Sequence, residues 1–349
     1  MRMCREALVG ILAGDAKEDR FFYGNVPLFK AIQKQLLQMK GGSFVFTPSS
    51  LLTNKISGFQ YEPDTDHWKA ASFPYPDVVY NRYPFRKEEQ NLANIFSSLK
   101  ERNIPYFNRR FFNKWEVIRC LRKNAVLSSL IPDSKRITSK QDLSAFLNNY
   151  HAVYVKPAFR SEGKGVLKIK AAANDHYELL SHNRMIISSS FEEIWKKIEN
   201  IVLNETYIVQ QEAAADYLFG MKYDLRVLVH FQRNQYNITG IGLRASRHIT
   251  THTKYGGMIL PFSIVEQQVN IQHLQTICHE IGKTLSNCFQ FVGEFSMDVG
   301  MDKKGNFYLY EINSKPMAFD EKEIFNKGIA QLSSLFFLLA EKKNTSFPF

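Results

Sequence analysis

In the first hundred positions, segments with the apolar pattern of a strand alternate with segments that have the apolar spacing of a helix. Residues 8–13 form a short unbroken apolar run that ends at Gly14, as expected for a buried strand. Over 26–37 the apolar residues recur at helical spacing, and Gly41 and Gly42 end this helix. The same reasoning predicts strands at 43–47, 76–84 and 104–108, a helix at 86–102, and an irregular stretch between 48 and 75. This alternation of strands and helices predicts an α/β unit.

The rest of the chain shows a different order of elements. Asn113 is a suitable N-cap for a short helix, and Pro132 excludes a helical continuation. The pattern then predicts, in order, a strand, glycine-bearing loop and strand over 152–170, a helix over 191–201, two strands within 207–230, a strand over 237–246, a loop over 248–257, a helix over 267–289 and a hairpin over 293–316. We therefore place the main domain boundary between Asn108 and Asn113.

The closing hairpin carries the strongest functional signal. In its first strand, Asp298 belongs to a polar set that alternates with apolar residues, as the period of two in a strand requires. Residues 302–306 form a polar turn, and the return strand places Glu311 and Asn313 on one face. Two carboxylates and an amide oxygen suit Mg²⁺, which fills its remaining positions with phosphate oxygens. A surface hairpin with a charged outer face is the alternative.

Composition limits the class of protein without selecting a function. Of the 349 residues, 44% are hydrophobic and 23% are charged, which is ordinary for a soluble globular protein of two or three domains. No apolar run approaches the roughly 18 residues of a membrane span. The net charge of +11 suits nucleic acid, an anionic membrane, or acidic small molecules and proteins. Because the basic residues are dispersed, we favour a phosphate ligand and an acidic co-substrate over nucleic acid.

The four cysteines are spread along the chain at Cys4, Cys120, Cys278 and Cys288, without a CxxC pair. This spacing indicates neither a zinc site nor a disulfide framework. A cytosolic protein is therefore expected.

Two segments are candidates for phosphate contact. Lys156 ends a strand, and the following loop contains Gly163 and Gly165, so this loop could fold over a triphosphate and supply backbone N–H donors. A plain hairpin is the alternative. Arg82 lies at the carboxyl end of a buried strand, where open α/β sheets bind ligands, and is a candidate anion contact. A structural arginine that hydrogen-bonds a turn is the alternative.

Further candidates lie on the strands of the second half. The edge over 210–213 could give an adenine base a main-chain donor and acceptor, and Asp216 follows where a carboxylate could reach ribose hydroxyls. Asp224 and Arg226 lie on one strand face, and a salt bridge across a half-exposed strand is the alternative. The residues of the edge are Gln210, Gln211, Glu212 and Ala213.

Taken in order, these signals resemble the ATP-grasp superfamily over about residues 108–335. Segments 68–86, 104–117 and 208–229 extend the resemblance over nearly the whole chain, to the YheC/YheD family of endospore coat-associated ATP-grasp proteins. The resemblance implies a mixed α/β (α+β) class, with a Rossmann-like pre-ATP-grasp domain at 1–108 and an ATP-grasp domain at 109–349. Within the latter it implies a lid subdomain at about 133–212 and a C-terminal subdomain at about 213–340.

The resemblance also implies ligands for metal and phosphate. Asp298, Glu311 and Asn313 match the magnesium ligands of ATP-grasp proteins, with Glu311 bridging two ions and Mn²⁺ as a substitute. Lys156 matches the lysine that contacts ATP phosphates beneath the glycine loop. Lys114 matches a second lysine near the phosphates.

The remaining implied roles concern the base, the ribose and the transferred group. Segment 210–213 matches the adenine-binding linker, although relatives often have Glu at the position of Gln211. Asp216 matches a ribose-binding acid. Arg226 and Arg244 match arginines that hold the transferred phosphoryl group or the acylphosphate.

The loop at 248–257 departs from the related enzymes. His252 and Lys254 stand where those enzymes often place an Asn before two glycines, which puts in doubt how the acceptor is held. His248 and His252 are candidates for a general base, and inert loop histidines are the alternative.

The resemblance implies an ATP- and Mg-dependent carboxylate–amine ligase that forms an amide through an acylphosphate. Its partners would be ATP, a carboxylate substrate and an amine donor, with an acidic peptide or a spore-coat protein as candidate acceptor. A spore-coat scaffold that binds nucleotide without turnover is the alternative, and nucleic-acid binding is the least favoured function. The expected location is the cytoplasm of a sporulating bacterium, in association with the spore coat.

Overall fold

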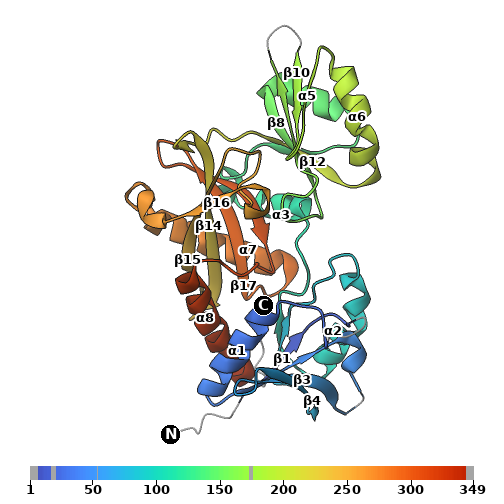
Figure 1. Cartoon of the computed structure of the whole chain (residues 1–349), viewed down its shortest axis with the longest axis vertical. Helices are drawn as coiled ribbons and strands as arrows, with labels where there is room; N and C mark the ends of the chain where they lie inside the picture. Colours follow the sequence, from blue (N-terminus) through green and yellow to red (C-terminus); the bar gives the residue numbers. More distant parts are fainter. Residues whose placement is uncertain (1–6, 17–20, 53, 173–175, 343–349) are drawn as a thin grey trace.

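The computed structural model describes residues 7–16, 21–52, 54–172 and 176–342, which form three sheets (Figure 1). The N-terminal sheet has the order β4-β3-β2-β1-β5-β6, from β1 (Leu8–Leu12), β2 (Gly42–Phe46), β3 (Ile56–Glu62), β4 (His67–Phe73), β5 (Val78–Asn81) and β6 (Tyr106–Phe107). The middle sheet has the order β11-β10-β9-β8-β12-β7, from β7 (Ser134–Arg136), β8 (Ala152–Pro157), β9 (Leu167–Ala171), β10 (Tyr177–Leu180), β11 (Met185–Ser188) and β12 (Tyr207–Gln211).

The C-terminal sheet has the order β16-β15-β14-β17-β18, and β13 pairs with β14. Its strands are β13 (Tyr217–Leu218), β14 (Met221–Gln232), β15 (Gln235–Ser246), β16 (Met258–Leu260), β17 (Glu294–Met301) and β18 (Phe307–Asn313). The described helices are α1 (Val26–Gln38), α2 (Ala93–Glu101), α3 (Lys114–Leu121), α4 (Ala125–Ser128), α5 (Lys140–Tyr150), α6 (Phe191–Asn204), α7 (Ile271–Phe289) and α8 (Lys322–Glu341).

The N-terminal sheet confirms the predicted α/β alternation at its centre. Strands β2, β1, β5 and β6 pair in parallel, and most of their residues are buried. The prediction of an irregular stretch at 48–75 was wrong, because β3 and β4 form an antiparallel hairpin there. Five of the seven residues of β4 are exposed, so the strand lacks the apolar alternation by which a half-buried strand is recognised.

The middle sheet has a hydrophobic core of its own, which includes Leu143, Val155, Ile169 and Trp195. The glycine-bearing segment forms a hairpin between β8 and β9, as predicted. The sequence pattern predicted no element between residues 170 and 191, but this segment holds two further strands, β10 and β11. Both are four residues long and partly exposed, so their periodic signal is short.

Helices α7 and α8 cover opposite faces of the C-terminal sheet. Helix α7 lies against the face of β14 that carries Phe231, since the ring of Tyr236 sits directly over Gly282 of α7. Helix α8 lies against the other face, where Gly328 packs on Leu228. Because successive side chains of a strand alternate, Asp224 and Arg226 share the face of Leu228. Their half of this face extends beyond α8 and faces the middle sheet.

Helix α8 also joins the C-terminal sheet to the N-terminal sheet (Figure 1). The ring of Phe336 lies 5.5 Å from that of Tyr80 and 5.9 Å from that of Phe107. One hydrophobic core therefore runs through both sheets, whereas the middle sheet is built around a separate core. The predicted domain limits are compatible with this arrangement and stay predictions.

Several helix boundaries differ from the predicted ones. The helix predicted at 86–102 consists of a 3-10 turn at Glu89–Leu92 followed by α2, because Arg86 to Glu88 form a turn. Helix α7 begins at Ile271 rather than at Gln267, with Asn270 as its N-cap. Asn113 caps α3 as predicted, and its side chain accepts hydrogen bonds from the N–H groups of Trp115 and Glu116.

The expectation of no disulfide framework was wrong in one respect. Cys120 of α3 and Cys288 of α7 form a disulfide, although 168 positions separate them in the sequence. Spacing could not show this pair, because the packing of α3 on α7 brings the two residues together. Cys278 is a buried free thiol, and Cys4 lies outside the described residues. None of the helices described is long and apolar enough to cross a membrane.

Candidate active site

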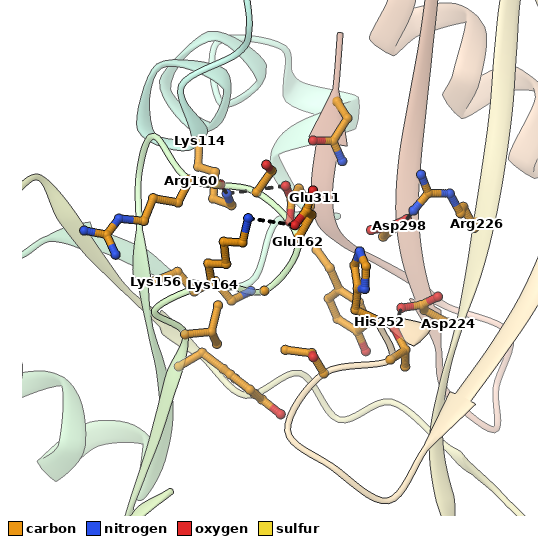
Figure 2. A pocket seen from close by; sticks show the side chains of 18 of the residues that line it. Lys114, Lys156, Arg160, Glu162, Lys164, Asp224, Arg226, His252, Asp298 and Glu311 are labelled. Atoms are coloured by element: carbon orange, nitrogen blue, oxygen red, sulfur yellow. Dashed lines mark hydrogen bonds and ion pairs between the residues drawn. The ribbon is translucent and has the colours of Figure 1, made fainter. Parts of the chain in front are cut away.

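A cavity of about 920 Å³ lies between the middle and C-terminal sheets, and loops of the N-terminal sheet border it. Figure 2 shows Lys114 and Lys156 on one side of it and Asp298 and Arg226 on the other. Every predicted site residue except Gly165 lines this cavity: Lys114, Lys156, Gly163, Gln210, Gln211, Glu212, Ala213, Asp216, Arg226, Arg244, Asp298, Glu311 and Asn313. The structure thus brings together residues that are separated by up to 199 positions.

Strands β17 and β18 place the three predicted metal ligands on one face. Asp298 pairs with Glu311, and Ser296 pairs with Asn313. A bulge lies next to this pair, because Val299 pairs with Leu309 and Tyr310 is left without a partner in the register. Without the bulge, Glu311 would share the buried face of Leu309. The extra residue turns Glu311 toward the cavity instead.

The Asp298 carboxylate is surrounded by arginine. Its Oδ1 lies 2.9 Å from Nη2 of Arg244 and 3.9 Å from Nη1 of Arg226. Burial by itself raises the pKa of Asp298, but the charges of Arg244 and Arg226 outweigh it and lower the pKa. The group is therefore ionised at neutral pH.

The residues at this face fit a hard divalent cation. Oδ1 of Asp298 is buried and accepts no hydrogen bond of good geometry from the residues that the structure describes, so it keeps lone pairs for a further cation. Glu311 and Asn313 supply a second carboxylate and an amide oxygen at the same wall. No group of three or more His, Cys, Asp and Glu side chains arranged for a metal occurs in the described part of the chain. A cation here would thus depend on Asn313 and on oxygen atoms of a bound ligand.

Lysines from the opposite side complete this charged centre. Nζ of Lys114, the first residue of α3, lies 3.3 Å from Oε1 of Glu311 and also donates to the carbonyl of Arg160. Nζ of Lys156 donates to Oε1 of Gln210 at 2.5 Å. Burial lowers the pKa of Lys156 to about 8, although the charge of Glu311 acts in the opposite direction.

Two main-chain N–H groups of the linker at 210–213 already have acceptors in the protein. The N–H of Gln211 donates to the carbonyl of Asp133 at 2.8 Å, and the N–H of Glu212 donates to the carbonyl of Ala152 at 3.1 Å. Among the described residues, no group accepts a hydrogen bond from the N–H of Ala213. A base bound to this edge would therefore find its donor at Ala213.

Sequence reasoning missed two lysines beside this linker. The carboxylate of Glu212 accepts hydrogen bonds from Lys168, at 2.5 Å, and from Lys222. Lys222 also donates to the Tyr154 hydroxyl at 2.6 Å. Burial lowers the pKa of Lys168 to about 8. Lys168 and Lys222 belong to no motif that the sequence analysis used, so no sequence signal distinguished them from other lysines on strands.

Asp224 pairs with Arg244 rather than with Arg226. The Arg244 guanidinium donates to both carboxylate oxygens of Asp224, at 2.9 and 3.0 Å, across the β14–β15 ladder. The Thr251 hydroxyl also donates to Asp224. The pair thus differs from the predicted alternative of a salt bridge across a half-exposed strand, because both residues are buried and the arginine comes from β15. Arg226 lies near Asp298 instead.

The glycine loop and the loop at 248–257 meet over the cavity. Gly163 and Gly165 both have positive φ values, of 69° and 76°. Nε2 of His182 lies 3.0 Å from the Gly163 carbonyl, and the His182 ring stacks on Tyr255 at 3.6 Å. Gly165 does not border the cavity; a side chain there would meet the hydroxyl of Tyr207. The contact between these loops reduces the opening of the cavity.

His252 and His248, the two candidates for a general base, lie in different places relative to the cavity. His252 lines the cavity, and burial together with the charges of Arg244 and Arg226 lowers its pKa, so it is neutral at pH 7. His248 lies outside the lining and packs on Gly256.

Arg82 makes structural contacts within the protein, which was the predicted alternative to an anion contact. Its side chain is buried, with Nη1 3.4 Å from Oε1 of Glu294 and Nη2 donating to the Pro316 carbonyl at 2.9 Å. These contacts hold the N-terminal sheet to the end of β18. The charge of Arg82 is neutralised by Glu294.

Comparison with known proteins agrees with this arrangement. Residues 103–339, more than half of the chain, match the family described as YheC/D-like ATP-grasp. The chain belongs to this family. It is 27% identical over 301 residues to the endospore coat-associated protein YheD of Bacillus subtilis (strain 168), in a match that covers 80% of this chain and 65% of YheD. It is 22% identical over 291 residues to YheC of the same strain, covering 78% of this chain and 79% of YheC. The chain thus spans slightly less than two thirds of YheD.

Solved structures share the fold of this family member. VanG D-Ala:D-Ser ligase from Enterococcus faecalis matches with a TM-score of 0.57 and 11% identity, over 95% of this chain and 100% of that one. D-alanyl-alanine synthetase A from Vibrio cholerae matches with a TM-score of 0.52 and 13% identity, over 96% and 99%. The ATP-grasp ligase PsnB with its minimal precursor matches with a TM-score of 0.53 and 13% identity, also over 96% and 99%. The predicted mixed α/β class with an ATP-grasp fold is therefore confirmed.

Proposed function

We propose that the protein is an ATP-dependent ligase that joins a carboxylate to an amine through an acylphosphate. One observation carries this proposal: Asp298, Glu311 and Asn313 share one face of a hairpin and meet Lys114 and Lys156 across a cavity. Oxygen ligands for a divalent cation thus stand opposite ammonium groups that suit phosphate. This pairing is what a bound nucleotide triphosphate requires.

Different residues of the cavity would bind the phosphates, the base and the ribose of ATP. Lys114 and Lys156 would contact phosphate oxygens, with the glycine loop above them. Ala213 would donate its N–H to the adenine base, and Asp216 would accept from ribose hydroxyls. Magnesium, as two ions or replaced by Mn²⁺, would be held by Asp298, Glu311 and Asn313 and would neutralise phosphate charge.

Arg226 and Arg244 would hold the group that is transferred. The substrate carboxylate attacks the γ-phosphorus of ATP, the bond to the bridging oxygen breaks, and ADP leaves. The amine nitrogen then attacks the acylphosphate carbon, phosphate leaves, and the amine loses a proton as the amide forms. Phosphoryl transfer asks the protein mainly for positioning and for charge stabilisation, which these arginines and the two lysines would supply. No nucleophilic side chain is needed.

The relatives support the choice of partners. One structure of the ATP-grasp ligase PsnB is a complex with a phosphomimetic variant of its minimal precursor, Mg and ADP. The names of YheC and YheD place them with the endospore coat. We therefore infer an acidic peptide or coat protein as acceptor, in the cytoplasm or coat of a sporulating bacterium. The net charge of +11 favours such an acidic partner.

Trapping of the acylphosphate tests the reaction directly. The protein is incubated with Mg-ATP, hydroxylamine and a panel of carboxylates, including acidic peptides and a sporulating-cell extract, and ADP and hydroxamates are measured by mass spectrometry. We expect ADP release that depends on a carboxylate, together with a hydroxamate of that carboxylate. Binding of AMPPNP without ADP release from any member of the panel would instead favour the nucleotide-binding scaffold.

A further inference from the structure

The N-terminal sheet has a crevice that opens on the cavity. The chain runs from β1 to β2 on one side of β1 and returns to β5 on the other side. The loops that follow β1 and β5 therefore diverge at the carboxyl ends of these strands, and such a switch point is where open α/β sheets bind ligands. Both loops line the cavity, through residues 23–25 and 82–86.

Two basic residues near this crevice are already neutralised. Arg82 pairs with Glu294, and Lys315 pairs with Glu89. Lys315 also donates to Oδ1 of Asn81 at 3.1 Å. These buried pairs fix the loops that carry them, and they leave little charge for a ligand.

Arg86 is different. It lines the cavity, is half-buried, and forms no ion pair with any carboxylate of the described residues. Its Nη1 donates to the Phe112 carbonyl at 3.0 Å, and its guanidinium carbon lies 4.4 Å from the ring centre of Phe111 and 5.2 Å from that of Phe159. A guanidinium held between two aromatic faces keeps its charge and loses much of its water. Arg86 is therefore a partly desolvated cation without a carboxylate counter-ion among the described residues, and a bound anion would supply one.

Arg86 also lies within reach of the charged centre. The charges of Glu311 and Glu89 act on it, against the effect of burial, which lowers its pKa. Phe159 follows Ala158, whose carbonyl accepts from the N–H of Lys114 at 2.8 Å. Arg86 thus lies where the N-terminal sheet, the start of α3 and the approach to the glycine loop meet.

The side of the crevice next to Arg86 is aromatic. Tyr23 and Phe85 pack edge to face with their ring centres 5.5 Å apart, and both line the cavity together with Phe111. Such a wall suits hydrocarbon atoms rather than a second charge. The phosphate-binding lysines, by contrast, lie on α3 and β8.

We propose that Arg86 binds the carboxylate of the acceptor substrate, in a subsite whose aromatic wall of Tyr23, Phe85 and Phe111 takes the carbon chain next to that carboxylate. This inference rests on the proposed ligase function and names the substrate class: a carboxylate carried on a hydrocarbon chain, such as a glutamyl side chain. Arg86 here replaces Arg82, four positions earlier, as the anion contact of the N-terminal sheet.

Arg86→Gln tests this subsite, since glutamine retains a donor for the Phe112 carbonyl and removes the charge. Arg110→Gln is the matched control, because Arg110 also stacks on an aromatic ring, that of Phe289 at 5.2 Å, and does not line the cavity. For the carboxylate that gives a hydroxamate, we expect the KM of Arg86→Gln to rise about 10- to 100-fold, the loss usual for a charged hydrogen bond. Arg86→Lys should recover part of it, and the Kd of AMPPNP should change less than twofold in each variant.

The outcomes separate this inference from the proposed function. If the wild type forms a hydroxamate and Arg86→Gln has an unchanged KM, the subsite is wrong and the ligase stands. If the Kd of AMPPNP rises as much as the KM, Arg86 contacts nucleotide and the subsite is equally wrong. If no hydroxamate forms, saturation-transfer NMR with acetate, hexanoate, glutamate and triglutamate decides on the AMPPNP-loaded protein. Binding that is lost in Arg86→Gln but not in Arg110→Gln would support the subsite without catalysis, and binding of none of the four would overturn it.

Discussion

Nζ of Lys114 lies 3.3 Å from Oε1 of Glu311, so the first residue of α3 forms an ion pair with a carboxylate of β18 (Figure 2). Each residue was predicted as a ligand contact, one for phosphate and the other for metal. In the structure they neutralise each other. A nucleotide with its cation would provide a negative partner for Lys114 and a positive partner for Glu311, and each would exchange one counter-ion for another.

Replacing Glu311 by Gln tests the metal face. We expect Glu311→Gln to lose at least about 100-fold in ADP release, because removal of a charged group that holds a catalytic cation typically costs several kcal/mol of transition-state stabilisation. The thermal midpoint should change little, because the glutamine side chain keeps an oxygen that can accept a hydrogen bond from Lys114. Glu116→Gln, at an exposed pair with Arg110 on the same helix as Lys114, is the control. A Glu311→Gln variant with wild-type turnover would refute the metal assignment.

The charge of Lys156 should make nucleotide binding depend on pH. Its pKa is about 8, so the ammonium is present below pH 8 and is lost as the pH rises through that value. We expect the affinity for AMPPNP to fall between about pH 7 and pH 9 in the wild type, measured by calorimetry at constant ionic strength.

Lys156→Ala should bind AMPPNP about 10- to 100-fold more weakly at pH 7, since one charge-assisted contact to phosphate is removed. Its affinity should also vary less with pH, and the slope that remains would belong to other lysines such as Lys168. A variant with unchanged affinity at pH 7 would remove Lys156 from the nucleotide site.

The contact between the glycine loop and the loop at 248–257 should respond to nucleotide. Arg160 and Lys164 are tryptic sites in the glycine loop. His182, in the turn between β10 and β11, bridges the two loops, because it contacts the Gly163 carbonyl and stacks on Tyr255. We expect Mg-AMPPNP to slow cleavage within 157–172 and 176–190, followed by mass spectrometry. Tyr255→Ala should weaken this protection because it removes the stack. Identical digestion patterns with and without nucleotide would exclude closure of this lid.

The disulfide between Cys120 and Cys288 should stabilise the protein. It links α3 to α7 across 168 positions, and cross-links over long segments typically contribute about 2–5 kcal/mol to the free energy of unfolding. We expect a reducing agent to lower the urea midpoint of the wild type and to leave that of Cys120→Ala unchanged. Alkylation followed by intact-mass analysis would show whether the bond forms. Equal midpoints with and without reductant, in a protein whose disulfide is formed, would contradict the expectation.

Much of the fold followed from local sequence signals. The cap at Asn113, the turn at 302–306 and the long strands β14 and β15 are each specified by residues within a few positions, because backbone geometry responds to near neighbours. Strand period also predicts the face that Asp224, Arg226 and Asp298 occupy, whereas the meeting of the cavity residues depends on how the sheets pack. Strands β4 and β11 escaped this reasoning, as exposed edge strands carry little apolar alternation.

The tertiary structure decided which side chains pair with each other. The sequence pattern left open whether Asp224 would pair within its strand, and the register of β14 with β15 selected Arg244. A single bulge at Tyr310 turned Glu311 from the core to the cavity. The pairing of Cys120 with Cys288 and the isolation of Arg86 likewise depend on which elements pack together. Periodicity specifies the face on which a side chain lies, whereas charge pairing depends on distances across the fold, which no local pattern contains.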